Sequence, residues 1–305
     1  MRRIIDPAEL RECGRPVCVA LGMFDGVHLG HQHVIRQAVL DAQSLGGLTV
    51  ALTFNPHPLA IVRPDRAPSL LQTVSQRLRA IEDMGVDVAL VLEFDDTFRN
   101  QTGEEFTGRL VREFGCLRSF SVGEGFEFGR DRSGSLDLLR RLGGELGFRV
   151  HGLAPISVGG EVVSSTRIRE VLRQGDLSHV AELLGRPYSL AGIVQRGDQL
   201  GRQLGVPTAN LDVRGRALPP NGVYAGRTRI DKVTYPVALN LGMRPTVGGS
   251  ELRAEAHVIN ATGDWYGLEL EIQVIELLRE ERRFANLTAL KAQISEDLSA
   301  VRARG

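Results

Sequence analysis

The first 184 residues alternate between short runs of β-branched or apolar residues and longer stretches in which apolar residues recur every three or four positions. The short runs predict strands, and the longer stretches predict helices with one buried face. Regular alternation of the two is typical of a parallel sheet covered by helices, because parallel strands need a crossover between them. The pattern therefore predicts a doubly wound α/β domain over residues 1–184.

The expected elements of this domain follow from the same runs. We expect strands at residues 17–21, 48–54, 88–94, 119–122 and 148–152. We expect helices at residues 31–42, 74–84, 104–114, 136–146, 166–173 and 177–184. The last two form a pair that begins at Ser164-Ser165-Thr166, whose hydroxyls suit a helix start, and breaks at Gly175-Asp176.

The helical pattern ends at Gly185-Arg186-Pro187-Tyr188, because proline disfavours helix at the residue before it. Short strands punctuated by Gly and Pro follow, at residues 190–194, 222–230, 235–241, 253–259 and 268–277. This spacing predicts a second domain, residues 185–305, built as a small antiparallel β-barrel. The chain ends in a predicted helix, which we expect to lie on the barrel through Leu287, Leu290, Ile294 and Leu298.

The charges of the chain balance, with 37 Lys+Arg against 37 Asp+Glu. The chain therefore lacks the overall positive field that gathers nucleic acid or an anionic membrane, and any anion must be held locally. The longest apolar runs fall far short of the roughly 20 residues of a membrane helix. Residues 1–12 carry charges where a signal peptide has its apolar core. We expect a cytoplasmic protein with no nucleic-acid or membrane partner.

Three cysteines and two lysines exclude several kinds of site. Cys13, Cys18 and Cys116 are odd in number and show no CxxC spacing, so neither a disulfide framework nor a zinc knuckle is indicated. Lys232 and Lys291 follow Asp and Leu, so a Walker A loop ending in Gly-Lys is excluded. A protein of this sequence that handles nucleotides does so by another device.

The first candidate site runs from Gly22 to His31, directly after the first predicted strand and at the start of the first predicted helix. In an open α/β sheet this place is the usual ligand crevice, and helix-start amides favour phosphate. His28 and His31 can add hydrogen bonds, and Gly30 leaves the backbone accessible. Taken alone, two histidines at this spacing are more often simple surface caps, and no third ligand supports a metal site.

Two further segments carry candidate residues. Ser164 to Arg169 combines a capped helix start with Arg167 and Arg169, whose charge is unfavourable at a helix N-terminus unless an anion binds there. A solvated helix face is the alternative. Thr53 to Pro58 follows the second strand, and its two prolines would hold Asn55 and His57 in a stiff loop, or simply form a strand exit.

These segments together resemble a known family. His28-Leu29-Gly30-His31 together with Ser164-Ser165-Thr166-Arg167-Ile168-Arg169 is similar to the nucleotidylyltransferase superfamily. The fuller set resembles the bacterial bifunctional riboflavin kinase / FMN adenylyltransferases, or FAD synthetases. The motifs that carry this likeness are collinear over nearly the whole chain and lie at 22–31, 53–58, 122–129, 164–169, 185–188, 201–211, 220–224, 240–246 and 255–257.

The resemblance implies that the N-terminal domain transfers AMP from ATP to FMN, giving FAD and pyrophosphate. It implies that His28 and His31 contact the ATP phosphates and that Arg167 holds the departing pyrophosphate. It also implies that Asn55 and His57 lie toward the flavin. The remaining implied ATP- or phosphate-binding residues are Gly22, Phe24, Gly30, Ser164, Thr166 and Arg169.

The resemblance implies that the barrel is a riboflavin kinase, which makes FMN from riboflavin and ATP. Gly201 and Gly205 would belong to a phosphate loop, and Thr208 and Asn210 offer hard oxygen ligands for the Mg²⁺ bound by ATP. Glu255 matches the general base of the family. Taken without the resemblance, Glu255 is one more outward strand carboxylate.

Two positions depart from the family pattern. Gly125 stands where Asp or Asn is usual, which would remove a polar side chain near the flavin, and Asn260 replaces a common Asp. One alternative is therefore an enzyme in which only the kinase is active. Another is a flavin-responsive binding protein without turnover. Nucleic-acid binding has only the arginine-rich composition in its favour.

Overall fold

The computed structural model describes residues 1–197, 205–246 and 249–304. The chain forms two compact units, of which the first comprises Met1–Pro68 and Val74–Ser164, and the second Ser69–Thr73 and Ser165–Gly305. This division groups the helical pair after Ser164 with the barrel, whereas the sequence pattern groups it with the α/β domain. The domain limits 1–184 and 185–305 stay a prediction.

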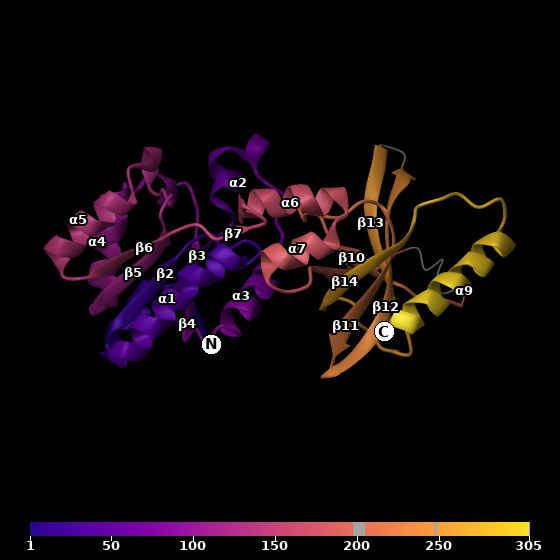
Figure 1. Cartoon of the computed structure of the whole chain (residues 1–305), viewed down its shortest axis with the longest axis horizontal. Coiled ribbons are helices and arrows are strands. Elements are labelled where there is room, and N and C mark those ends of the chain that lie inside the picture. The colour runs from indigo at the N-terminus through magenta and orange to yellow at the C-terminus, as the bar shows by residue number, and fades with distance from the viewer. Residues whose placement is uncertain (198–204, 247–248, 305) are drawn as a thin grey trace. The chain divides into compact units, whose positions relative to one another are not determined.

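The first unit holds an all-parallel sheet, as predicted (Figure 1). The sheet has one strand more than expected, β1, and its order is β1-β4-β3-β2-β5-β6. The strands are β1 (Arg2–Ile4), β2 (Val17–Leu21), β3 (Leu48–Asn55), β4 (Val88–Glu93), β5 (Leu117–Gly123) and β6 (Arg149–Leu153). The helices are α1 (Leu29–Leu45), α2 (Pro58–Val62), α3 (Val74–Glu82), α4 (Gly103–Phe114) and α5 (Leu136–Leu146). Short 3₁₀ helices lie at Pro7–Cys13, Pro64–Arg66, Phe98–Asn100 and Arg130–Arg132, and a hairpin pairs β7 (Ser157–Val158) with β8 (Glu161–Val162).

Helices cover both faces of this sheet. Successive strand residues point to opposite faces, so neighbouring residues of one strand pack against different helices. Val19 and Leu21 of β2 belong to the buried cluster that includes residues of α4 and α5. Ala20, between them, belongs to the cluster formed with α1 and α3. Ala51 on β3 lies in the same second cluster, and such small side chains allow α1 and α3 to pack close to the strands.

The strand order reverses direction at β2, which lies between β3 and β5. The carboxyl ends of these parallel strands share one edge of the sheet, where the chain leaves β2 for α1, β3 for α2 and β5 for the loop before α5. Ligands of open α/β sheets bind in the crevice outside such a reversal. The fold thus brings the segments after β2, β3 and β5 to one edge.

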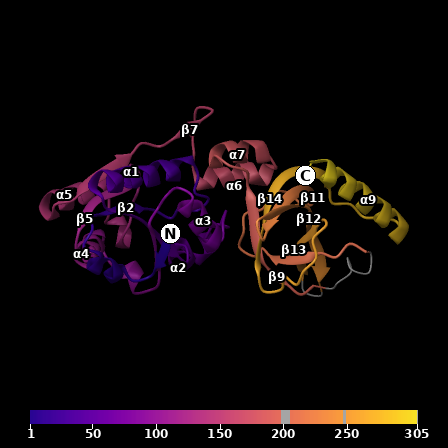
Figure 2. The ribbon, with the colours of Figure 1, turned by 90° about the horizontal axis from the view of Figure 1, so that it is seen from below.

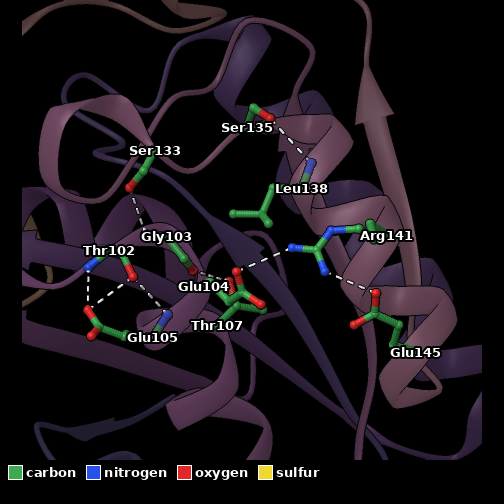
Figure 3. A network of polar contacts seen from close by, with 10 residues as sticks. All are labelled: Thr102, Gly103, Glu104, Glu105, Thr107, Ser133, Ser135, Leu138, Arg141 and Glu145. Carbon is green, nitrogen blue, oxygen red and sulfur yellow. Dashed lines mark hydrogen bonds and ion pairs between the residues drawn. The ribbon is translucent and has the colours of Figure 1, made fainter.

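A polar network fixes the start of α4 against the loop that follows β5 (Figure 3). Thr102 and Glu105 form a reciprocal capping box, and Gly103 N donates to Ser133 Oγ at 3.0 Å. These hydrogen bonds hold the pKa of the Glu105 carboxyl below its usual value, with the Thr102 backbone amide the main cause. A Cβ at Gly103 would lie 2.4 Å from Gly134 Cα. The backbone of α4 and the backbone of the loop are therefore too close together for a side chain at this position.

The second unit begins with the helices α6 (Ser165–Gln174) and α7 (Leu177–Leu184), followed by the barrel (Figure 2). Its strands close in the order β10-β13-β12-β11-β14-β9, and all observed pairs are antiparallel, as expected. They are β9 (Ser189–Gln195), β10 (Ala209–Asp212), β11 (Gly222–Ile230), β12 (Val233–Thr246), β13 (Gly249–Val258) and β14 (Glu269–Glu280). The short β10 was not expected from the sequence.

The C-terminal helix α9 (Leu287–Arg304) packs on β11 and β12 but not through the whole expected face. Val301 is buried and Leu298 packs beside it, whereas Leu287 is 66% exposed. The first turn extends beyond the barrel, so the expectation for Leu287 was wrong. A polar contact further along the helix also attaches it to the barrel. Buried Asp297 accepts two hydrogen bonds from the Arg279 guanidinium on β14, at 2.8 and 3.0 Å.

A short strap, Ser69–Thr73, belongs to the second unit although it lies far from the barrel in sequence. Leu70 N donates to Gly215 O at 2.8 Å, and Ala217 N donates back to Leu70 O at 2.9 Å. Arg216 Nη1 donates to Gln72 O at 2.8 Å. The strap is therefore hydrogen-bonded at Leu70 and at Gln72 to the loop before β11.

Candidate active sites

The loop between β2 and α1 places two imidazoles at a helix start. His28 is the N-cap of α1, and its Nδ1 accepts a hydrogen bond from His31 N at 3.3 Å. The two rings stack with centroids 3.6 Å apart, and Phe24 meets His31 edge-on at 5.4 Å. The structure brings Phe24, His28 and His31 together at the positive end of the helix dipole, a favourable place for phosphate.

Two glycines of this loop lie close to its aromatic rings. An added Cβ at Gly30 would lie 3.2 Å from the His28 ring and 3.7 Å from Val163 O. Gly22 would meet the Phe24 ring at 2.8 Å. Gly30 therefore leaves room for the His28 imidazole, and Val163 O lies beside it.

A buried arginine that the sequence analysis missed braces this loop. Arg77 on α3 is 2% exposed, and its Nη1 donates to Met23 O at 2.7 Å and to Thr53 Oγ1 at 2.9 Å. Thr53 Oγ1 in turn donates to Met23 O at 3.0 Å. Arg77 therefore ties the loop after β2 to the end of β3. The signal was an arginine on the otherwise apolar side of a predicted helix.

Asn55 and His57 lie at the end of β3, as predicted. Asn55 is exposed and joins Pro56 by a cis peptide bond. His57 caps the short helix α2, which the sequence did not predict, and its Nδ1 accepts from Leu59 N at 3.1 Å. The loop after β3 therefore leads directly into a capped helical turn.

A row of aromatic rings borders the same sheet edge. Successive ring centroids lie 5.3 to 6.0 Å apart, from Phe54 through Phe94, Phe98, Phe106 and Phe128 to Phe126. The row links the ends of β3 and β4 to the loop after β5. Gly125 lies in that loop, and an added Cβ there meets nothing within 4 Å, so a side chain at this position has space.

The residues from Ser164 to Arg169 have different surroundings. Ser164 is half-buried at the end of the first unit, and Thr166 is exposed in the first turn of α6. Arg167 Nη2 lies 3.0 Å from His179 Nε2 on α7. Arg169 is buried, and its Nε donates to Ser69 O at 2.6 Å, which connects α6 to the strap. The arginines thus do not share one solvated face.

The second candidate site is a row of polar residues across three barrel strands. Glu255 on β13 pairs in register with Asn210 on β10 on one side and with Asn240 on β12 on the other. Side chains directly opposite each other on paired strands point to the same face. All three are half-buried, while their neighbours Ala254 and Ala256 are buried inside the barrel, so the row faces outward. Asn240 was quoted as part of a motif but given no role, and asparagine inside a strand was the available signal.

A histidine two residues beyond Glu255 holds the loop that leads into β10. His257 Nδ1 lies 2.7 Å from Pro207 O, and since a carbonyl only accepts, the ring nitrogen donates. This bond places half-buried Thr208 beside Asn210 at the edge of the row. Gly205 adopts φ 81°, as a glycine loop allows, whereas Gly201 lies outside the described residues. Arg253 Nη1 lies 3.8 Å from the Glu255 carboxylate.

Two absences hold for the described part of the chain. It contains no cluster of three or more His, Cys, Asp or Glu side chains that could hold a metal ion. Among the same residues, no helix is long and apolar enough to cross a membrane.

Comparison with known proteins finds a different family model for each half of the chain. Residues 10–167 match the family model described as FAD synthetase, and residues 184–304 match the one described as riboflavin kinase. The bifunctional riboflavin kinase/FMN adenylyltransferase of Pseudomonas fluorescens is 38% identical over 94% of this chain and 92% of its own length. The protein of the same name from Escherichia coli (strain K12) is 35% identical over 92% of this chain and 90% of its own.

A solved structure shares the fold over the whole chain. The crystal structure of a macrolide-efflux protein from Streptococcus pneumoniae superimposes with a TM-score of 0.81 at 27% identity and covers 98% of both chains. The parallel-sheet domain, the barrel and the two family matches define a two-domain enzyme of flavin cofactor synthesis. The chain belongs to the family of bifunctional riboflavin kinase/FMN adenylyltransferases, which confirms the resemblance.

Proposed function

We propose that the chain makes FAD from riboflavin in two ATP-dependent steps, each at its own site. The barrel phosphorylates riboflavin to FMN, and the α/β domain transfers AMP from ATP to FMN, releasing pyrophosphate. One observation carries this assignment: the chain has two separate groups of polar residues, and each group lies within one of the two family matches. One surrounds the start of α1, and the other is the outward row around Glu255.

In the adenylyl transfer, a phosphate oxygen of FMN bonds to the α-phosphorus of ATP while the bond to pyrophosphate breaks. The FMN phosphate is already a nucleophile, so the protein needs to align the reactants and stabilise charge rather than supply a base. We assign contacts with the ATP phosphates to His28 and His31, which lie in hydrogen-bond reach of each other at the helix start. Gly22, Phe24 and Gly30 shape the loop that holds them.

The charge that builds on the departing pyrophosphate requires a cation, which we assign to Arg167 with the hydroxyls of Ser164 and Thr166. Arg169 is assigned to the phosphates through its charge, and its bond to Ser69 O also holds the strap. On the flavin side, exposed Asn55 and half-buried His57 offer polar groups next to the phenylalanine row. Aromatic faces and a few polar groups are what a flat, partly polar ring system needs.

In the kinase step, the riboflavin 5′-hydroxyl oxygen bonds to the γ-phosphorus of ATP and ADP leaves. Glu255 takes the proton of that hydroxyl as the oxygen attacks. Thr208 and Asn210 would hold Mg²⁺, and their neutral side-chain oxygens fit an ion that arrives with the nucleotide phosphates. When bound, that ion neutralises charge on the transferring phosphoryl group. Asn240, on the other side of Glu255, is the remaining polar group of the row.

Two crossed variants test the assignment of one reaction to each site. Glu255→Gln should lower FMN formation from riboflavin by about 10²-fold or more, since it removes a general base, and should leave conversion of supplied FMN to FAD unchanged. His31→Ala should lower FAD formation by about 10²-fold and spare the kinase, because it removes a donor to developing phosphate charge.

Matched controls lie close by. Glu276→Gln changes an outward carboxylate of β14 that is paired with Arg304, and His33→Ala changes another histidine of α1. Both controls should keep both activities. Loss of both reactions from either Glu255→Gln or His31→Ala would contradict the two-site assignment.

A further inference from the structure

The guanidinium of Arg167 meets a histidine that the sequence analysis did not single out. Arg167 lies in the first turn of α6, and His179 lies in the first turn of α7. Gly175 at φ 84° makes the turn between the helices, and Asp176 caps α7 by accepting from His179 N at 2.9 Å. The hairpin therefore fixes the His179 backbone, and it sets His179 Nε2 3.0 Å from Arg167 Nη2.

The partners of His179 determine its protonation. An arginine side chain offers only donors, so the nitrogen that meets it must accept. The other ring nitrogen, Nδ1, lies 3.1 Å from a Glu182 carboxylate oxygen, which only accepts. The ring is therefore neutral, with its proton on Nδ1 and its lone pair on Nε2. Glu182 selects the tautomer that can receive the arginine.

A neutral acceptor suits an arginine that must bind an anion. Arginine loses much rotamer freedom when it is fixed, so a contact made before the substrate binds reduces that cost at the moment of binding. The imidazole holds one donor of the Arg167 guanidinium in place through Nε2. The Glu182 carboxylate contacts the ring on its other side, at Nδ1.

We infer that His179, oriented by Glu182, is a positioning residue that sets Arg167 for the pyrophosphate group in adenylyl transfer. The inference rests on the proposed role of Arg167. It predicts that His179 acts only through that arginine and that the kinase reaction does not depend on it. Glu182 is 60% exposed, so its share of the effect is the smaller one.

The test uses the full chain and follows the adenylyltransferase in reverse, with FAD and pyrophosphate as substrates, because pyrophosphate is the group that Arg167 is proposed to hold. His179→Phe keeps a ring but removes the acceptor, and should raise the KM for pyrophosphate about tenfold, the effect of losing one hydrogen bond to a charged group. His179→Gln restores an acceptor and should return the KM to within about threefold of the unchanged protein. Riboflavin phosphorylation in the same preparations should not change.

A double variant separates this inference from the proposed function. Arg167→Met should impair adenylyl transfer, and Arg167→Met with His179→Phe should be no worse than Arg167→Met alone, because the two residues act as one unit. Additive losses, or a His179→Phe protein with an unchanged KM beside an impaired Arg167→Met, would overturn the positioning role and leave the role of Arg167 standing. An Arg167→Met protein with normal adenylyl transfer would overturn both.

Discussion

Gly125 stands where the family resemblance leads us to expect Asp or Asn, near the expected flavin. An added side chain there meets open space, and its φ is not among the left-handed ones. We therefore expect Gly125→Asp to leave the thermal midpoint unchanged and to lower the KM for FMN about fivefold, the effect of one added hydrogen bond. Steady-state kinetics of FAD formation check this.

Gly144→Asp is the control, since Gly144 also has open space but lies on α5. A KM for FMN that stays the same or rises in Gly125→Asp would show that the side chain usual in the family has no role at this position of this chain.

Asp212 at the end of β10 gives a pH-dependent prediction. Hydrogen bonds from the Arg214 guanidinium hold the pKa of its carboxyl down, from 3.8 to about 2. Because the pKa is lower in the folded chain, the pair stabilises the fold above about pH 4, and this contribution is lost as the pH falls from about 4 toward 2. Arg214 is well exposed, so the effect is modest.

Thermal unfolding of Asp212→Asn and the unchanged protein from pH 3 to 7 measures that contribution. The difference between their midpoints should be constant above pH 5 and should shrink as the pH approaches 3. A difference that grows at low pH would contradict the assigned cause.

At the scale of elements, the close approach of α4 to the loop after β5 makes Gly103 sensitive. In Gly103→Ala, the new Cβ would lie 2.4 Å from Gly134 Cα, so backbone must shift, and we expect a loss of about 1–3 kcal/mol in the free energy of unfolding. The shift displaces the loop that carries Gly125, so FAD formation should fall more than FMN formation. Denaturant unfolding and the two assays check this.

Gly108→Ala is the matched control on the same helix. Its Cβ would meet only the end of the Arg112 side chain, at 3.4 Å. Alanine favours helix over glycine, so this variant should gain about 0.5–1 kcal/mol. Equal losses in the two variants would show that the contact with Gly134 is not the cause.

Elements whose ends are marked in the sequence were predicted with their observed limits. Residues 136–146 and 177–184 are α5 and α7, because Ser135 and Asp176 cap their starts and Gly147 and Gly185 end them in the left-handed conformation. The strands β1 and β10 are too short for an alternation to show. Helix α2 lies behind two prolines that also suit a loop.

The sites were predicted where one motif contains the residues and missed where pairing brings them together. His28 and His31 are three residues apart, so a helix start suffices to place them. Asn240 joins Glu255 only through the register of β12 with β13. Arg77 acquires its role from the carbonyl of Met23, 54 residues away in sequence. Such contacts depend on the tertiary fold, which local patterns do not contain.

At the scale of the whole molecule, two folds with separate cores carry two reactions that share one intermediate. FMN is the product of the barrel and the substrate of the parallel-sheet domain. The matches to FAD synthetase and riboflavin kinase do not overlap along the chain. The account therefore predicts an ordered appearance of products in one reaction mixture.

The most direct test of this central claim is a time course with purified protein, riboflavin, ATP and Mg²⁺, in which the flavins are separated chromatographically. The account predicts that FMN appears first and FAD follows, over many turnovers per protein molecule. Accumulation of FMN with no FAD would contradict the activity assigned to the sheet domain, and the absence of any product would contradict both assignments.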